Sequence, residues 1–115
     1  MQEISEVDIH AVLDELQRDL THGHTARTLA KHGELRILLL ALRRGAVVPE
    51  HKADGRVSIH TIRGHVRVRA GERLFDLPVG RLITLEPGER HDVEAMEDSG
   101  VLVTIAMSTP QFPKP

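Results

Sequence analysis

The chain has 115 residues and a formal net charge of −2, and 40% of its residues are apolar, 28% charged and 2% aromatic. This length suits one domain, and the nearly balanced charge gives no general attraction to nucleic acid or to a membrane, so neither is expected as a partner. Cysteine is absent, which excludes disulfides, thiol catalysis and thiolate metal sites. No signal-like segment opens the chain and no apolar run is long enough to cross a bilayer, so a cytoplasmic protein is expected.

The N-terminal segment, residues 1–25, is predicted to be a helix and a loop that pack on the rest of the domain. A helix is expected from Ser5 to about Leu20, because apolar residues recur at helical spacing at Ile9, Leu13, Leu16 and Leu20. Ser5 followed by Asp8 resembles a capping box at the start of this helix. Gly23 suits the stop that commonly follows a helix.

Two histidines, His22 and His24, follow this helix as an H-x-H pair. Such a pair can contribute to a metal site, but further ligands are needed and none lies nearby in the sequence. A solvated loop with two polar side chains is therefore the favoured interpretation.

Residues 26–107 are dominated by short apolar runs separated by turn signals, which is typical of an antiparallel sandwich or small barrel. Strands are predicted at 26–31, 34–43, 56–62, 65–70, 73–77, 81–85, 91–96 and 101–107. In the strand from Arg56, strict alternation places Val57 and Ile59 on one face and His60 on the other. The tail, residues 108–115, holds three prolines and is expected to be an arm or a frayed end.

The strand predicted at 34–43 is apolar on both faces, so both faces are expected to be covered. One face would line the barrel interior. The other would need either the N-terminal helix or a second subunit, and a homodimer is expected on this ground, with the helix as the competing explanation.

The stretch from Gly45 to Ala95 contains two motifs that resemble those of a known family. Gly45, five residues, His51 and then a strand that ends in Ile62-Arg63-Gly64 resemble the first cupin motif. Gly80 followed by Leu85-Glu86-Pro87-Gly88-Glu89-Arg90-His91 resembles the second. The chain thus resembles a small single-domain cupin of the RmlC-like jelly-roll superfamily. The resemblance implies a mainly β, antiparallel jelly-roll barrel with one N-terminal helix.

The cupin resemblance also implies a divalent transition metal (Fe, Mn, Ni or Zn), held by two histidines and a glutamate of the first motif and a histidine of the second. His51 and His91 match the first and last of these ligands. The second histidine falls on Ala53 and the glutamate on Val57. Two imidazoles without a carboxylate are a weak ligand set for such a metal, so the metal site is expected to be degenerate.

Three other side chains are candidates for a third ligand. His60 is the best of them, although parity puts it on the face opposite Val57 unless a bulge reverses the strand. Glu50 adjoins His51 but alternation directs it away, and Asp54 lies in a loop that could bring it inward.

These residues leave several functions open. The favoured one is a small-molecule binding module, whose pocket is predicted to be lined by His51, Val57, Ile59, Val68, Leu85, His91, Val93 and Val103. The alternative is an enzyme of the isomerase or dioxygenase class, with a reduced metal set of His51 and His91, or a metal-free isomerase in which one of them is the general base. A third is a structural or regulatory protein with a filled pocket, in which the two histidines only form hydrogen bonds at the barrel mouth.

Overall fold

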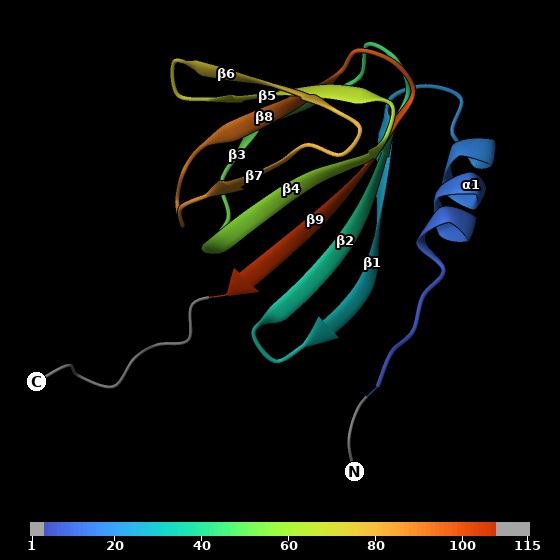
Figure 1. Ribbon diagram of the computed structural model, residues 1–115, viewed down its shortest axis with the longest axis horizontal. Helices are drawn as coiled ribbons and strands as arrows, with labels where there is room; N and C mark the ends of the chain where they lie inside the picture. The colour runs from blue at the N-terminus through green and yellow to red at the C-terminus, as the bar shows by residue number, and fades with distance from the viewer. Residues whose placement is uncertain (1–3, 108–115) are drawn as a thin grey trace, which may run out of the picture.

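A computed structural model describes residues 4–107, and the predicted tail at 108–115 lies outside the described residues. Within that range one helix and nine strands follow one another in the chain (Figure 1). They are α1 (Ile9–Asp19), β1 (His24–His32), β2 (Leu35–Leu42), β3 (Val47–His51), β4 (Gly55–Arg63), β5 (His65–Ala70), β6 (Arg73–Pro78), β7 (Leu82–Leu85), β8 (His91–Ala95) and β9 (Ser99–Met107).

The strands form two antiparallel sheets that stack as the layers of a jelly-roll sandwich (Figure 1). One has five strands in the order β1-β2-β9-β4-β7, and the other has four in the order β3-β8-β5-β6. All strand pairs are antiparallel, so the predicted mainly β jelly roll with one N-terminal helix is confirmed.

The interior between the sheets is aliphatic, as the scarcity of aromatic residues predicts. In the five-stranded sheet, cross-strand partners share a face, so Leu38, Val103 and Ile59 form one row of the inner surface. The four-stranded sheet supplies fully buried Val66 and Val68 to the same core. The strict alternation predicted for β4 is confirmed by its burial pattern.

The outer face of the five-stranded sheet is covered by α1, which lies beside β1 outside the sandwich in Figure 1. Leu13 and Leu16 of the helix pack against Leu39 and Ala41 of β2. The helix therefore accounts for the second apolar face of this strand, which was one of the two expected explanations. The face it covers is that of Leu39 and Ala41, because the alternate leucines of β2 point into the sandwich.

The bounds of several elements differ from the sequence prediction: β1 begins at His24 rather than at residue 26, and β3 lies where no strand is predicted. The helix begins at Ile9 rather than Ser5, because the Asp8 side chain is the N-cap and accepts a hydrogen bond from the Ala11 amide at 3.1 Å. The Ser5 hydroxyl instead contacts His32 at 3.0 Å, so the predicted capping box is wrong. Strand β9 begins at Ser99, within the predicted turn. Of the residues described, none belongs to a helix with the length and apolar character needed to cross a membrane.

Candidate functional site

A cavity of about 340 Å³ lies between the two sheets, at the end of the sandwich where the β3–β4 loop connects them. Such a volume is within the range of small-molecule sites in proteins. Its lining residues come from six strands and that loop, and they are mostly aliphatic: His24, Ala26, Leu38, Leu40, Val48, His51, Lys52, Ala53, Val57, Ile59, His91, Val93, Val103 and Ile105.

His51 and His91 are cross-strand partners at the end of the β3–β8 pair. Their ring centroids lie 4.3 Å apart, with the ring planes tilted by 59°. A β-bulge between Val48 and His51 lets both residues line the cavity although they are three positions apart. The bulge therefore places the first histidine on the inner surface, opposite the second.

The two imidazoles are held in the same way. Nδ1 of His51 bonds the carbonyl oxygen of Pro49 at 2.9 Å, and Nδ1 of His91 bonds that of Glu89 at 3.0 Å. A carbonyl only accepts, so Nδ1 carries the proton in both rings and Nε2 is the acceptor nitrogen of the neutral form. Nothing within residues 4–107 bonds to either Nε2, which leaves both nitrogens available to a ligand.

The electrostatic environment of His91 favours its neutral form. The residue is 3% exposed, and its burial lowers the pKa of the imidazole below the ordinary value. The neighbouring His51 lowers that pKa further, while the Glu89 carbonyl opposes the shift. His91 is therefore a neutral hydrogen-bond acceptor at neutral pH.

Most of the residues predicted to line the pocket do lie on the cavity wall, namely His51, Val57, Ile59, His91, Val93 and Val103. The other two do not. Val68 is fully buried in the sandwich core behind the cavity. Leu85 pairs with Val57 but contributes to a second pocket.

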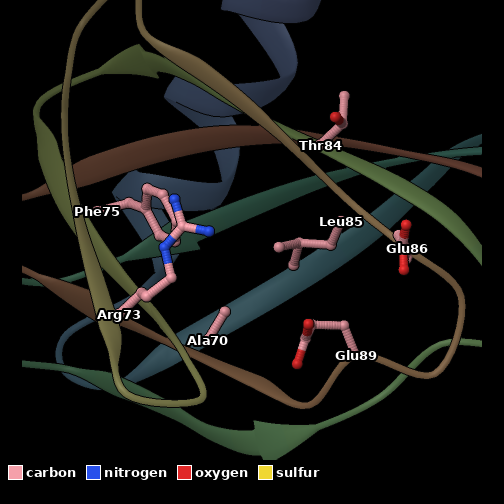
Figure 2. A pocket seen from close by; sticks show the side chains of 7 residues that line it. All are labelled: Ala70, Arg73, Phe75, Thr84, Leu85, Glu86 and Glu89. Carbon is pink, nitrogen blue, oxygen red and sulfur yellow. The ribbon is translucent and has the colours of Figure 1, made fainter.

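That second pocket, of about 350 Å³, lies between the β5–β6 hairpin and the segment that follows β7. Figure 2 shows Arg73 and Phe75 on one side of it and Glu86 and Glu89 on the other. The Arg73 guanidinium lies 4.9 Å from the centre of the Phe75 ring, a cation–π contact within the wall. With charges of both signs around its rim, this pocket has a polar character that the main cavity lacks.

The residues present do not fit the metal that the cupin resemblance implies. His60 lies on the face of β4 opposite Val57 and Ile59, as the alternation predicts, and it is not among the residues that line the cavity, so its position does not support a third ligand. Glu50 is exposed and faces Arg90 at 3.7 Å, and Asp54 is exposed in the loop. Across residues 4–107 no three His, Asp or Glu side chains gather as a metal site would require, which also holds for the H-x-H pair.

Several wall residues were missed from the sequence. Three of them share an inward face with residues that were predicted: Leu38 and Leu40 of β2 and Ile105 of β9. Continuing the alternation along these two strands would have identified them. His24 and Lys52 depend on where β1 begins and how the β3–β4 loop folds. No local pattern carries that information.

A family model for the AraC-like ligand-binding domain matches residues 34–106. The chain belongs to this family. The matched AraC-like range includes both cupin-like motifs and every wall residue except His24 and Ala26. No curated protein matches the chain in sequence.

Solved structures agree on the cupin fold of this AraC-like domain. A conserved protein of unknown function from Streptococcus pyogenes superposes with a TM-score of 0.74 at 17% identity, covering 95% of this chain and 92% of that one. A cupin superfamily protein from Desulfitobacterium hafniense gives 0.73 at 14% identity, with 81% and 87% covered. An RmlC-like cupin from Desulfovibrio desulfuricans gives 0.68 at 23%, with 73% and 82% covered. The predicted cupin relationship is confirmed.

Proposed function

We propose that this AraC-like domain binds a small organic molecule with an apolar body in the cavity between its sheets, and that His51 and His91 are its polar contacts. The observation that carries the proposal is the aliphatic cavity, at whose wall two imidazoles each have an Nε2 that bonds to no group of residues 4–107. Aliphatic walls with a few convergent polar groups are the usual composition of a ligand site.

The contacts favour binding over metal catalysis. Val57 puts an apolar side chain where the cupin resemblance places the carboxylate ligand, and it is 3% exposed in the core. A metal held by two imidazoles would lack the charge compensation that a carboxylate supplies. No specific feature of the described residues favours the isomerase or dioxygenase alternative. The cavity also argues against the hypothesis of a pocket filled by side chains.

The test is to fill the cavity. Val103→Phe places a ring inside the sandwich, whereas Thr104→Phe places the same ring on the opposite face of β9 and is the matched control. The fluorescent neutral probe N-phenyl-1-naphthylamine should bind the wild type and the control, and binding should be lost in Val103→Phe. Equal probe binding by all three proteins would show that the cavity is not the site.

A second measurement looks for the natural occupant. Protein purified without a tag is denatured, and its small-molecule extract is compared by mass spectrometry with the extract of Val103→Phe. A compound that is present in the wild-type extract and absent from the Val103→Phe extract supports the proposal. Purified protein that contains stoichiometric metal and turns over a substrate would contradict it.

The predicted homodimer stays a prediction, and its main argument is weakened because α1 covers Leu39 and Ala41. Sedimentation velocity at micromolar concentration tests it directly. The cytoplasmic location likewise stays a prediction.

A further inference from the structure

The cavity wall carries charge of only one sign. Among the residues described, its titratable members are His24, His51, Lys52 and His91, and none of the lining residues is acidic. The whole chain, by contrast, has 17 acidic residues and a net charge of −2. With Lys52 as a cation and no acidic side chain on its wall, the cavity attracts anions and repels cations.

A further cation borders this wall. Arg36 of β2 faces inward, because it pairs with Ile105 and lies two residues before Leu38, and both of these line the cavity. Ile105 in turn pairs with Val57, so Arg36 lies in the same inner row as Val57, two strands or roughly 10 Å away. The long arginine side chain can span much of that distance.

The Arg36 side chain has no polar partner among residues 4–107. Its Nε is buried without a hydrogen bond, and no ion pair joins its side chain to any residue within 4–107. Other arginines of the chain are paired, as Arg27 is with Glu15 at 3.1 Å and Arg63 with Asp14 at 2.8 Å. Removing part of a guanidinium from water without a partner is unfavourable.

The cross-strand neighbour of Arg36 makes this cost larger. Lys31 of β1 pairs with Arg36 and shares its inward face, so two cations lie directly opposite each other. Like charges in that relation destabilise a sheet. An anion between or beside them would relieve the repulsion and supply the missing hydrogen-bond partner.

We propose that the ligand of this cavity carries a carboxylate, that Arg36 binds this carboxylate with Lys31 beside it, and that the apolar body of the ligand extends along Leu38, Ile105 and Val57. The proposal rests on the proposed function and names its ligand class, an amphipathic organic acid. The planar fork of arginine matches a carboxylate in a bidentate pair, which favours this group over a neutral polar one.

The test compares two probes of the same size, octanoate and its neutral amide octanamide, by isothermal titration calorimetry. The wild type should bind octanoate at least about tenfold more tightly, since hydrogen bonds to charged groups are the stronger ones. Arg36→Met should remove that preference, because it weakens octanoate binding far more than octanamide binding, and Arg36→Lys should keep part of it. Arg56→Met is the matched control, because Arg56 adjoins Val57 but faces away from the cavity, and it should keep the full preference.

Four results overturn the inference. If the wild type binds the two probes with equal affinity, the inference is overturned. The proposed function remains, because the amide still binds in the cavity. An unchanged preference in Arg36→Met places the carboxylate elsewhere, and a lost preference in Arg56→Met shows only a net-charge effect. Binding of neither probe removes this inference, and loss of the neutral naphthylamine probe as well removes the proposed function.

A readout that needs no variant accompanies this comparison. The Nε–H resonance of Arg36 should shift on addition of octanoate and stay in place with octanamide. An unperturbed resonance in the octanoate complex would contradict the contact even if the affinities differ.

Discussion

The imidazole rings of His51 and His91 lie 4.3 Å apart, centroid to centroid, and each Nδ1 is bonded to the backbone carbonyl two residues earlier in the chain. The two rings are therefore fixed at Nδ1 and open at Nε2. Only His91 is buried, so the pair is asymmetric, with one exposed imidazole and one shielded from water.

This asymmetry predicts a pH-dependent stability. Burial lowers the pKa of His91 in the folded protein below its value in the unfolded chain, which is about 6.5. As the pH falls below that unfolded value, the unfolded chain takes up the proton first, so the free energy of unfolding decreases until the pH reaches the lowered pKa of the folded state. His91→Gln, which cannot be charged, should show a smaller loss. Urea unfolding at about pH 8 and about pH 5.5 measures both proteins.

The control for this experiment is His22→Gln, a substitution at an exposed loop histidine. It should lose stability with falling pH as the wild type does. If His91→Gln and the wild type lose equal amounts, another group is responsible for the acid sensitivity.

The degenerate metal site predicts that the missing ligands can be restored. Ala53 lines the cavity beside His51, and Val57 lines it from β4. The double variant Ala53→His, Val57→Glu would supply an imidazole and a carboxylate at the positions that the cupin resemblance assigns to ligands. Three or more such ligands are what Zn²⁺ and Ni²⁺ require, so their affinity should rise by orders of magnitude over the wild type.

Calorimetric titration with Zn²⁺ measures this affinity, and thermal melting provides a second readout. Without metal the variant should melt below the wild type, because Val57→Glu buries an unpaired carboxylate. Added Zn²⁺ should recover that loss, while adding His51→Ala should abolish the recovery. Wild-type protein that already binds Zn²⁺ as tightly as the variant would contradict the degenerate-site interpretation.

The sequence was informative wherever a repeating pattern determined the structure. The sandwich and most of one cavity wall could be predicted from two features. These are the alternation at Val57 and Ile59 and the two motifs around His51 and His91. The bulge before His51 and the place of Lys52 at the cavity wall depend on how two strands meet, and no single segment of the sequence encodes that. Leu85 has the predicted parity but lines the second pocket and not the main cavity, and alternation alone does not distinguish the two.

The contact between Leu13 and Gly100 predicts a coupled pair of substitutions. A Cβ at Gly100 would lie 2.3 Å from a methyl carbon of Leu13, which is fully buried under the sheet. Leu13→Ala should cost about 2–5 kcal/mol through the cavity it leaves, and Gly100→Ala about 1–3 kcal/mol through overpacking. The double variant should cost clearly less than the sum, because the new methyl group occupies vacated space.

Chemical unfolding of the four proteins gives the coupling energy. If the two losses in the free energy of unfolding are additive, the helix moves away from Gly100 when a methyl group is added there and does not hold its position. A matched control is Gly45→Ala, where no atom lies within 4 Å of the added Cβ but the backbone has a positive φ of 84°. Gly45→Ala should lower the free energy of unfolding, and its effect should add to that of Leu13→Ala because the two positions share no contact.

The last prediction concerns how the helix is fastened to the sandwich. The Arg43 side chain, just after β2, donates to the carbonyl oxygen of Leu20 at 2.6 Å and to that of Gln17, both at the end of α1. It also pairs with Asp98 at 2.9 Å. Arg43→Met removes these contacts together and leaves the last carbonyls of the helix with fewer donors, so it should lower the free energy of unfolding by about 1–3 kcal/mol.

Arg44→Met is the matched control, since it changes the net charge equally. Asp98 accepts from the Arg44 backbone amide at 2.8 Å, and that bond survives the loss of the side chain. Hydrogen exchange should report faster exchange for α1 amides in Arg43→Met than in Arg44→Met, because only the former loosens the helix terminus. Equal exchange in the two variants would mean that the packing of Leu13 and Leu16 holds the helix without help from Arg43.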